Sequence, residues 1–365
     1  MFIESTNCNE IAQRIAAKAV GKTALLSMGE HTEIEVTELV EALNQQEVHF
    51  MGAIFPKVIA HNEAFEKGIV VAVIDQTNEI YTVRDISKRE YTIAPYQFEE
   101  ALDYSLVTFV DGLTSHISNY LGALYEKYGM KTNYFGGGAG SLSLEQQPCV
   151  FSSEGFFEDA AVYCLVPMKS AIGVKHGWNK LEGPYIVTKA EKNTVEEINW
   201  DTPFDTYKDI VETDTNTAFN DDNFFDLAKG YPLGIIKQGV DYIIRDPLTV
   251  NKEGALVCIG EVEENTLINI MKGDQTSLLQ AAKDAANECL SKAQNPKTGI
   301  IIDCISRVLY LEDNFKTELE NISNTIHEKY PELSMTGALT LGEISSYGNG
   351  YIEFYNKTIV VGLFE

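Results

Sequence analysis

The pattern of apolar and polar positions repeats three times along this chain. Each repeat starts with a short apolar run that predicts a strand, and continues with apolar residues at steps of three and four, which predict an amphipathic helix. A strand-like run that contains glycine follows, and then a loop and an apolar return strand. The first strands start at Thr23, Ser105 and Gly299, and the return strands start at Ile69, Ala160 and Ile359. The chain is therefore predicted to use one strand–helix–strand–hairpin unit three times.

The glycines of the second strands have a structural explanation in two of the three repeats. A residue without Cβ lets a strand kink or lets another element pack closely, which accounts for Gly52 and Gly337. The middle repeat has four glycines between positions 136 and 140, Gly137 and Gly138 among them. This excess predicts that the backbone there faces a ligand or the opposite half of the protein.

A phosphate is not the expected ligand of this glycine-rich strand. No lysine of a P-loop follows it, and a dinucleotide fingerprint would need glycine where Ser141 or Ser143 stands. The residues that follow predict a strand and a turn, whereas phosphate binding needs a helix that opens directly after the loop.

Two halves are predicted from the region between the second and third repeats. Short strands with turn residues precede a predicted helix over 202–212 and a polar, acidic stretch over 213–232. The change in composition there predicts one domain of residues 1–200 and a second of residues 201–365. The expected fold class is α/β, with mixed sheets packed against helices.

Composition excludes several classes of partner. The chain has 365 residues and a net charge of −26, so nucleic acid and anionic membrane surfaces are poor partners. No apolar run reaches the length of a membrane span, and the first residues do not form a signal peptide. The six cysteines show no paired spacing for zinc. We therefore expect free thiols and a cytoplasmic protein.

Arginine is scarce, and two of the five arginines follow apolar strands: Arg245 and Arg307. The guanidinium group is a fork-shaped donor for carboxylates or phosphates, and strand ends are where α/β proteins bind ligands. Glu343 follows the third glycine strand and offers a carboxylate to an ammonium group. We expect these three side chains to face one crevice, with the Gly136–Gly140 backbone near it. The alternative for each arginine is a salt bridge to one of the many acids.

Cys304 and His176 are the remaining candidates. Cys304 lies on the strand that leads to Arg307, but no histidine stands in a protease-like motif. A small core residue is therefore favoured over a nucleophile, and no enzyme is predicted. His176 lies in KHGWN, which is typical of a turn with a packed indole. Its alternative roles are a ligand contact or an axial metal ligand.

An ordered set of short motifs covers the chain from about residue 20 to its end. The first group is FVDGL from Phe109, GGGAG from Gly136, KHGW from Lys175 and YIVTKAEKNTVEEIN from Tyr185. The second group is GYPLGI from Gly230, YIIRDP from Tyr242, DCISR from Asp303, GEI from Gly342 and YNKTIVV from Tyr355. Together they resemble the N-terminal and C-terminal halves of the FIST family. Unlike the family pattern, Gly52 is followed by apolar residues, which weakens any binding role for the first repeat.

The resemblance implies a sensory module of the kind found in bacterial, archaeal and some eukaryotic signalling proteins. It implies a small ligand, proposed for the family to be an amino acid or a derivative. Its output partners would be separate signalling proteins, such as a histidine kinase or a chemotaxis receptor. Some relatives are linked to haem and nitric oxide, so a haem-binding gas sensor with His176 as axial ligand is one alternative. An interaction scaffold without ligand is another.

Overall fold

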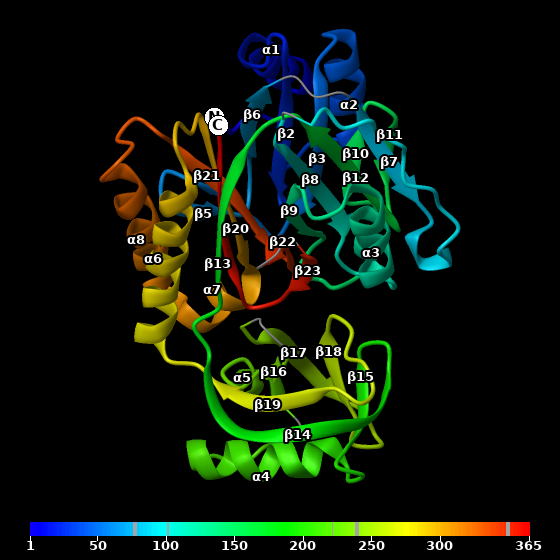
Figure 1. The fold of residues 1–365 in the computed structure, drawn as a ribbon, viewed down its shortest axis with the longest axis vertical. Coiled ribbons are helices and arrows are strands. Elements are labelled where there is room, and N and C mark those ends of the chain that lie inside the picture. The colour runs from blue at the N-terminus through cyan, green and yellow to red at the C-terminus, as the bar shows by residue number, and fades with distance from the viewer. Residues whose placement is uncertain (76–78, 101, 221, 238–240, 348–350) are drawn as a thin grey trace.

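The strands of the described residues form three six-stranded sheets and a closed barrel. The computed structural model describes residues 1–75, 79–100, 102–220, 222–237, 241–347 and 351–365. Figure 1 shows the barrel at one end of the molecule and the three sheets at the other. The predicted α/β class, with mixed sheets and packed helices, is confirmed.

All three sheets follow one plan, which confirms the threefold repeat. Each has a parallel pair of strands at its centre. These pairs are β2 (Lys22–Gly29) with β3 (His49–Phe55), β8 (Tyr104–Asp111) with β9 (Thr132–Ala139), and β20 (Thr298–Cys304) with β21 (Met335–Thr340). The antiparallel return strands are β6 (Ile69–Asp75), β12 (Ala160–Val166) and β24 (Ile359–Phe364). The edge strands β1 (Phe2–Ile3), β7 (Ile80–Arg84) and β13 (Ser170–Lys175) pair with them in turn.

The hairpins are exchanged between the units in a ring. Each hairpin leaves the unit that precedes it in the chain and completes the sheet of another unit. The hairpins are β4 (Lys57–Ala60) with β5 (Glu63–Phe65), β10 (Val150–Ser152) with β11 (Gly155–Phe157), and β22 (Glu343–Tyr347) with β23 (Tyr351–Tyr355). They pair with β21, β3 and β9 respectively. Each of the three sheets is therefore complete only in the presence of another unit.

This exchange explains the glycines of the second strands. Gly52 lies opposite Phe151 of the incoming hairpin, and a Cβ on Gly52 would lie 2.4 Å from the Phe151 ring. In the middle unit a Cβ on Gly137 would lie 2.7 Å from Cγ2 of Thr340, and one on Gly138 would lie 3.1 Å from Cα of Gly112. The excess glycines thus allow the third unit and the backbone after β8 to pack closely on β9.

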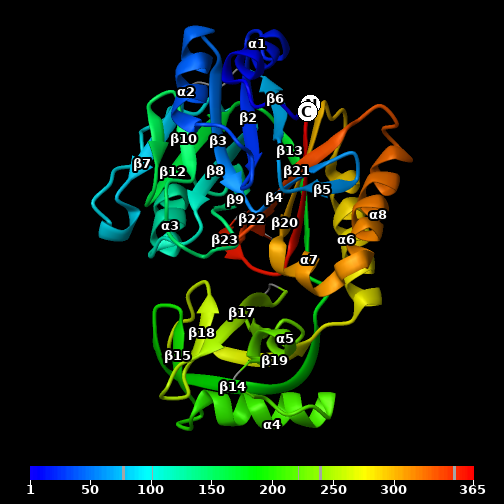
Figure 2. The same ribbon diagram turned by 180° about the vertical axis from the view of Figure 1, so that it is seen from behind.

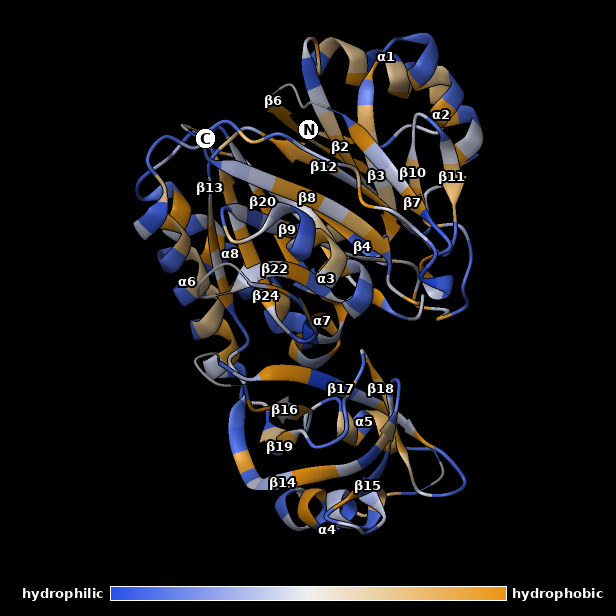
Figure 3. Ribbon diagram, turned by 45° about the vertical axis from the view of Figure 1, so that its right-hand side comes forward, coloured by the Kyte–Doolittle hydropathy of each residue, from blue (hydrophilic) through white to orange (hydrophobic). Residues whose placement is uncertain are grey.

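Helices cover the outer faces of the sheets. The helices that follow the first strands are α2 (Val36–Gln45), α3 (Ile117–Tyr128) and, after the short α7 (Ile305–Leu311), α8 (Phe315–His327). The first and third units have a further helix before the first strand, α1 (Cys8–Lys18) and α6 (Gln275–Lys292). In the second unit the short 3-10 turn Ile86–Lys88 and the irregular residues after it occupy this place. Figure 3 shows that the strands are largely apolar while the helices carry many polar residues.

The barrel is inserted between β13 and α6 (Figure 2). Its strands are β14 (Asn179–Glu191), β15 (Thr194–Ile198), β18 (Leu256–Ile259), β17 (Ile243–Val250), β16 (Leu233–Ile235) and β19 (Leu267–Lys272), in that spatial order. The predicted helix over 202–212 is α4 (Pro203–Thr215), and α5 (Phe224–Ala228) lies in the stretch that the sequence presented as a linker. Phe219 and Phe224 there pack on Tyr207, so this stretch belongs to the barrel core.

Two chain segments connect the barrel to the three units, which we call the body (residues 1–175 and 275–365). Residue 200 lies between β15 and α4, within the barrel region. The barrel uses segments from both predicted ranges. The division of the chain into domains of residues 1–200 and 201–365 stays a prediction.

Candidate functional site

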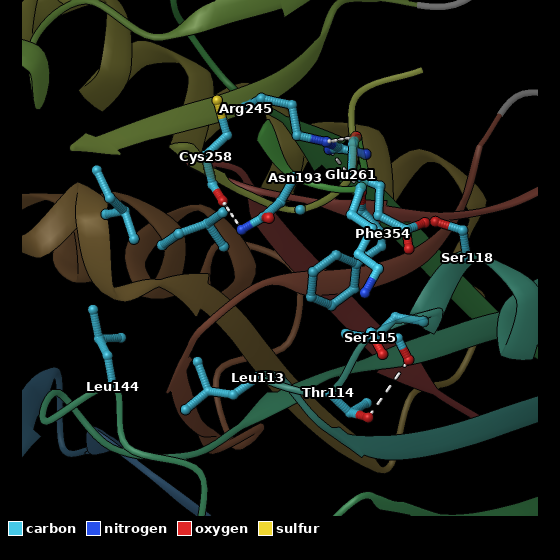
Figure 4. Close-up of a pocket in the computed structure, with 16 residues that line it drawn as sticks. Leu113, Thr114, Ser115, Ser118, Leu144, Asn193, Arg245, Cys258, Glu261 and Phe354 are labelled. Atoms are coloured by element: carbon cyan, nitrogen blue, oxygen red, sulfur yellow. Dashed lines mark hydrogen bonds between the residues drawn. The ribbon is translucent and has the colours of Figure 1, made fainter. Parts of the chain in front are cut away.

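A cavity of about 300 Å³ lies where the barrel meets the second unit (Figure 4). Its body wall is the segment after β8 and the start of α3, and its barrel wall comes from β17, β18 and the turn between β14 and β15. It is lined by Gly112, Leu113, Thr114, Ser115, Ile117, Ser118, Leu144, Lys192, Asn193, Arg245, Leu248, Cys258, Ile259, Gly260, Glu261 and Phe354. The cavity thus lies at the carboxyl end of a parallel strand pair, where α/β sheets bind ligands.

The N-terminus of α3 opens at this cavity without a cap from its own chain segment. His116 precedes the helix with φ of 67°, and its side chain makes no capping hydrogen bond. Instead the backbone N–H of His116 donates to Oε1 of Glu261 from the barrel at 3.2 Å. The carboxylate therefore lies at the positive end of the α3 dipole. The Glu261 side chain is 27% exposed, so it is accessible from the cavity side.

Arg245 is the buried cation of the barrel wall. Its Nε donates to the Glu261 carbonyl at 2.8 Å, and its Nη1 donates to the carbonyls of Ile244 and Phe354 at 3.0 and 3.1 Å. Its ion-pair contact is the longer one to Oε1 of Glu353, at 4.0 Å. Burial lowers the pKa of Arg245. The guanidinium is thus satisfied mainly by carbonyl groups, and its charge is only weakly compensated.

The other walls combine hydroxyl groups with aliphatic surface. Ser115 and Ser118 stand at the start of α3, and Asn193 is held by a hydrogen bond from Nδ2 to the Cys258 carbonyl at 2.9 Å. The apolar part includes Leu113 and Phe354. A cavity with a few polar groups on an apolar surface is typical of a small-molecule site.

Arg307 does not share this cavity with Arg245. Its side chain is fully buried, forms an ion pair with Glu318 of α8, and has Nε 3.4 Å from Oδ1 of Asp303. It also donates to the carbonyl of His176, on the connection from β13 to the barrel, and to the carbonyl of Leu278 in α6. The expected common crevice is therefore not formed. The reason is local: α7 begins directly after Cys304, and this turn returns Arg307 to the interior.

Glu343 and Cys304 lie near Arg307 inside the third unit, away from the cavity. Glu343 is fully buried and accepts from the Thr340 hydroxyl at 3.0 Å and the Thr358 N–H at 3.2 Å. Burial raises the pKa of Glu343 to about 8, and it raises the pKa of the Cys304 thiol. A protonated Glu343 does not attract an ammonium group, and a protonated thiol is a poor nucleophile. Gly137 and Gly138 pack against protein and do not line the cavity.

His176 lies in the turn that the sequence predicts. Its Nδ1 accepts from the Trp178 N–H at 2.9 Å, and its Nε2 lies 3.0 Å from Oδ1 of Asp241. The Trp178 indole is buried and donates to the Lys357 carbonyl at 2.9 Å. Both ring nitrogens of His176 have partners, so the residue does not fit the role of an axial haem ligand.

A second polar cluster fixes the barrel to the third unit. Nζ of Lys357 lies 3.1 Å from Oδ2 of Asp246 on β17 and donates to the Lys229 carbonyl at 2.9 Å. It also lies 4.9 Å from the centre of the Trp178 ring. Ser306 donates to the same Asp246 carboxylate at 2.7 Å. Buried charges of this kind are paired because unpaired ones are costly.

Family models match almost the whole chain. The FIST N domain model matches residues 23–201, and the FIST C domain model matches residues 203–346. The chain belongs to the FIST family. FIST domains are sensory, signal-transduction domains. A comparison with curated proteins found no match. In this FIST protein the cavity is lined from both matched regions, with Ser118 in the first and Arg245 in the second.

Among the described residues, no helix is long and apolar enough to cross a membrane. Within the same residues, no group of three or more His, Cys, Asp and Glu side chains is arranged to hold a metal ion.

Sequence reasoning missed Glu261 and Lys357 of this FIST protein. Glu261 follows an apolar strand and a glycine, a signal like the one that selected Arg245. With 54 acidic residues in the chain, this signal does not distinguish Glu261 from the other acids. Lys357 stands between a tyrosine-rich strand and an apolar strand. A lysine between two strands indicates a buried acidic partner, but only the folded structure shows which acidic residue that partner is.

Proposed function

We propose that this FIST protein is a sensor of a small amphipathic carboxylate, an amino acid or a derivative, and that it binds this ligand in the cavity between the barrel and the second unit. The observation that supports the proposal is the composition of the cavity wall. A helix N-terminus, a weakly compensated buried arginine and an accessible carboxylate lie on one apolar cavity.

Each part of an α-amino acid has a complementary group in this cavity. The N–H groups of the first turn of α3 and the hydroxyl of Ser118 suit a carboxylate, and the charge of Arg245 adds long-range attraction. Glu261 suits an ammonium group. Leu113, Leu248 and Phe354 suit an aliphatic or aromatic side chain. Of the residues selected from the sequence, the proposal retains Arg245.

The position of the cavity also supports a sensory role. A ligand there contacts the barrel and the body at once, so it stabilises one orientation of the barrel over others. We propose that this change of population is the signal and that a separate output protein, such as a histidine kinase or a chemotaxis receptor, receives it. The six cysteines form no disulfide, which supports a cytoplasmic location.

A thermal-shift screen against amino acids and related carboxylates tests the proposal. A ligand that binds only the native state raises the melting temperature, by an amount that grows with ligand concentration. Leu248→Trp fills the cavity and is expected to abolish the shift. The matched control is Leu142→Trp, since Leu142 is 40% exposed and does not line the cavity.

Three outcomes would contradict this function. The first is the absence of any stabilising ligand at about 1 mM, which would favour the scaffold alternative. The second is a shift that persists in Leu248→Trp, which would place the ligand elsewhere. The third is turnover of a bound compound, which would make the protein an enzyme.

A further inference from the structure

The barrel carries a row of apolar side chains on its outer face. Ile235 and Ile268 point into the barrel and are 5% and 0% exposed, so their neighbours Ile236 and Leu267 point outward. These two are 38% and 45% exposed, and the Ile236 N–H donates to the Leu267 carbonyl at 2.8 Å. Ile186 of β14 lies directly opposite Leu267 and extends the row.

Trp200 lies next to this row and adds an exposed aromatic side chain to it. The residue before it, Asn199, donates its N–H to the Ile186 carbonyl at 2.8 Å and accepts from the Ile186 N–H at 2.9 Å. The Trp200 N–H donates to the Thr188 hydroxyl at 3.0 Å. These bonds fasten the turn to β14 while the Trp200 side chain is 75% exposed, with φ of 66°. We call Ile186, Trp200, Ile236 and Leu267 the apolar strip.

Exposure of this kind indicates an interaction surface. Single exposed apolar residues are ordinary, but adjacent ones mark binding sites. Tryptophan is enriched among the residues that dominate binding energy at interfaces. A bulky side chain at positive φ is uncommon, and here the bonds to β14 hold it. The other tryptophan, Trp178, is 3% exposed, so the two indoles have opposite environments.

The charges near the strip define the chemistry of its partner. Asp201 follows Trp200, and Glu264 precedes Leu267 by three residues, so two acidic residues stand beside the strip residues in the sequence. The neighbouring lysines are neutralised, Lys189 by Glu196 and Lys237 by Glu353, each at 2.6 Å. The net charge of the chain is −26. A second copy would therefore be repelled, whereas a basic partner would be attracted.

We propose that the apolar strip is a docking surface for a separate protein that presents an apolar segment flanked by lysine or arginine. The four strip residues line none of the cavity. The proposal goes beyond the ligand site and does not depend on the ligand's identity. Its biological meaning rests on the proposed sensory function, because a sensor needs a surface through which it contacts its output protein.

Acrylamide quenching of the unmodified protein tests this surface. Trp200 is accessible to the quencher and Trp178 is not, so the quenchable emission reports on the strip. The probe is a synthetic amphipathic helix made of leucine and lysine, compared with the same peptide in which glutamate replaces lysine. We expect saturable protection of the quenchable emission by the lysine peptide and none by the glutamate peptide.

Two variants show whether the peptide is on the strip. Leu267→Ser retains Trp200 and is expected to weaken binding about tenfold, since loss of a central interface side chain has effects of this size. The control is Met130→Ser on the body, because Met130 is 62% exposed and outside the strip; binding should be unchanged. Neither the quenching nor the peptide binding requires a ligand in the cavity. The test of the strip can therefore be interpreted even if the ligand proposal fails.

The proposal is overturned by any of three results. The lysine peptide fails to protect Trp200, or Leu267→Ser binds it as tightly as the unmodified protein does. In the third, sedimentation shows a dimer that Leu267→Ser dissociates, which would make the strip an interface between two copies of this chain.

Discussion

The second and third units place different groups at the same point of the repeat. At the carboxyl ends of β8 and β9, the second unit leaves a cavity lined by hydroxyl groups, a helix N-terminus and aliphatic surface. At the carboxyl ends of β20 and β21, the third unit holds Arg307, Asp303 and Glu343 in the protein interior. The same architecture thus gives one end with a cavity, where we propose that a ligand binds, and one end that is filled by the protein's own charges.

The difference teaches that a charged residue at a strand end is not by itself a ligand contact. Arg245 and Arg307 have the same position relative to an apolar strand in the sequence. The groups around them differ: Arg245 is met by carbonyls, and Arg307 by the Glu318 carboxylate. A guanidinium group that already forms an ion pair within the protein gains little by binding the carboxylate of a ligand.

The largest effect is expected from breaking the charged cluster of the third unit. Arg307→Leu leaves Glu318 and Asp303 buried without their cation. We expect a loss of about 3–5 kcal/mol in the free energy of unfolding, measured by urea denaturation. Arg307→Leu combined with Glu318→Leu should recover much of the loss. If Arg307→Leu alone leaves stability unchanged and weakens ligand binding, the distinction between the two units fails.

A smaller loss is expected from the contact that fixes the barrel to the body. Lys357→Met removes the cation that lies 3.1 Å from Asp246, and we expect a cost of about 3 kcal/mol because the carboxylate stays buried. The two connecting segments should also become more sensitive to limited proteolysis. Unchanged proteolysis together with unchanged stability would show that this pair does not hold the barrel.

The pH dependence of stability should reveal Glu343. Its pKa rises from 4.5 to about 8 on folding, so the folded state holds this proton more tightly than the unfolded state does. The contribution of the group to stability is then full below about pH 4.5 and is lost progressively up to about pH 8. Glu343→Gln removes this dependence. Its melting temperature, relative to that of the unmodified protein, should increase with pH across this window. If the melting temperatures of Glu343→Gln and the unmodified protein change with pH in parallel, the raised pKa of Glu343 is contradicted.

The smallest effect is expected at the cavity itself. Glu261→Gln keeps an acceptor for the His116 N–H but removes the charge at the α3 N-terminus, so stability should fall by only about 0.5–1 kcal/mol. The same change should weaken binding of an amino acid more than binding of the matching acid without an amino group. Equal losses for both ligands would remove Glu261 from the role of ammonium partner.

Much of the fold was predictable because it follows from local pattern. The apolar runs at Thr23, Ser105 and Gly299 identify the first strands, and the helical spacing after them identifies α2, α3 and α8. The exchange of hairpins was not predictable, since nothing in the sequence of β10 says that it pairs with β3 and not with its own unit. For the same reason, the sequence predicts only separate strands and a linker where the structure has the barrel.

The site was predictable in part. Arg245 was predicted to follow an apolar strand; it lies instead within β17 (Ile243–Val250), and it lines the cavity. Arg307 satisfied the same rule but turns inward, because α7 starts immediately after β20. The glycines between positions 136 and 140 predict a close approach to the backbone, and they allow the third unit to pack closely on β9. A contact between remote segments, such as that of Glu261 with α3, has no local signal.

The most direct test of the central claim is a crystal structure of the protein with the amino acid or carboxylate that stabilises it most. The account predicts density in the cavity, with the ligand carboxylate within hydrogen-bonding distance of the Ser118 N–H and hydroxyl and with the ammonium group at Glu261. An empty cavity at saturating ligand, or density beside Arg307 in the third unit, would contradict the account.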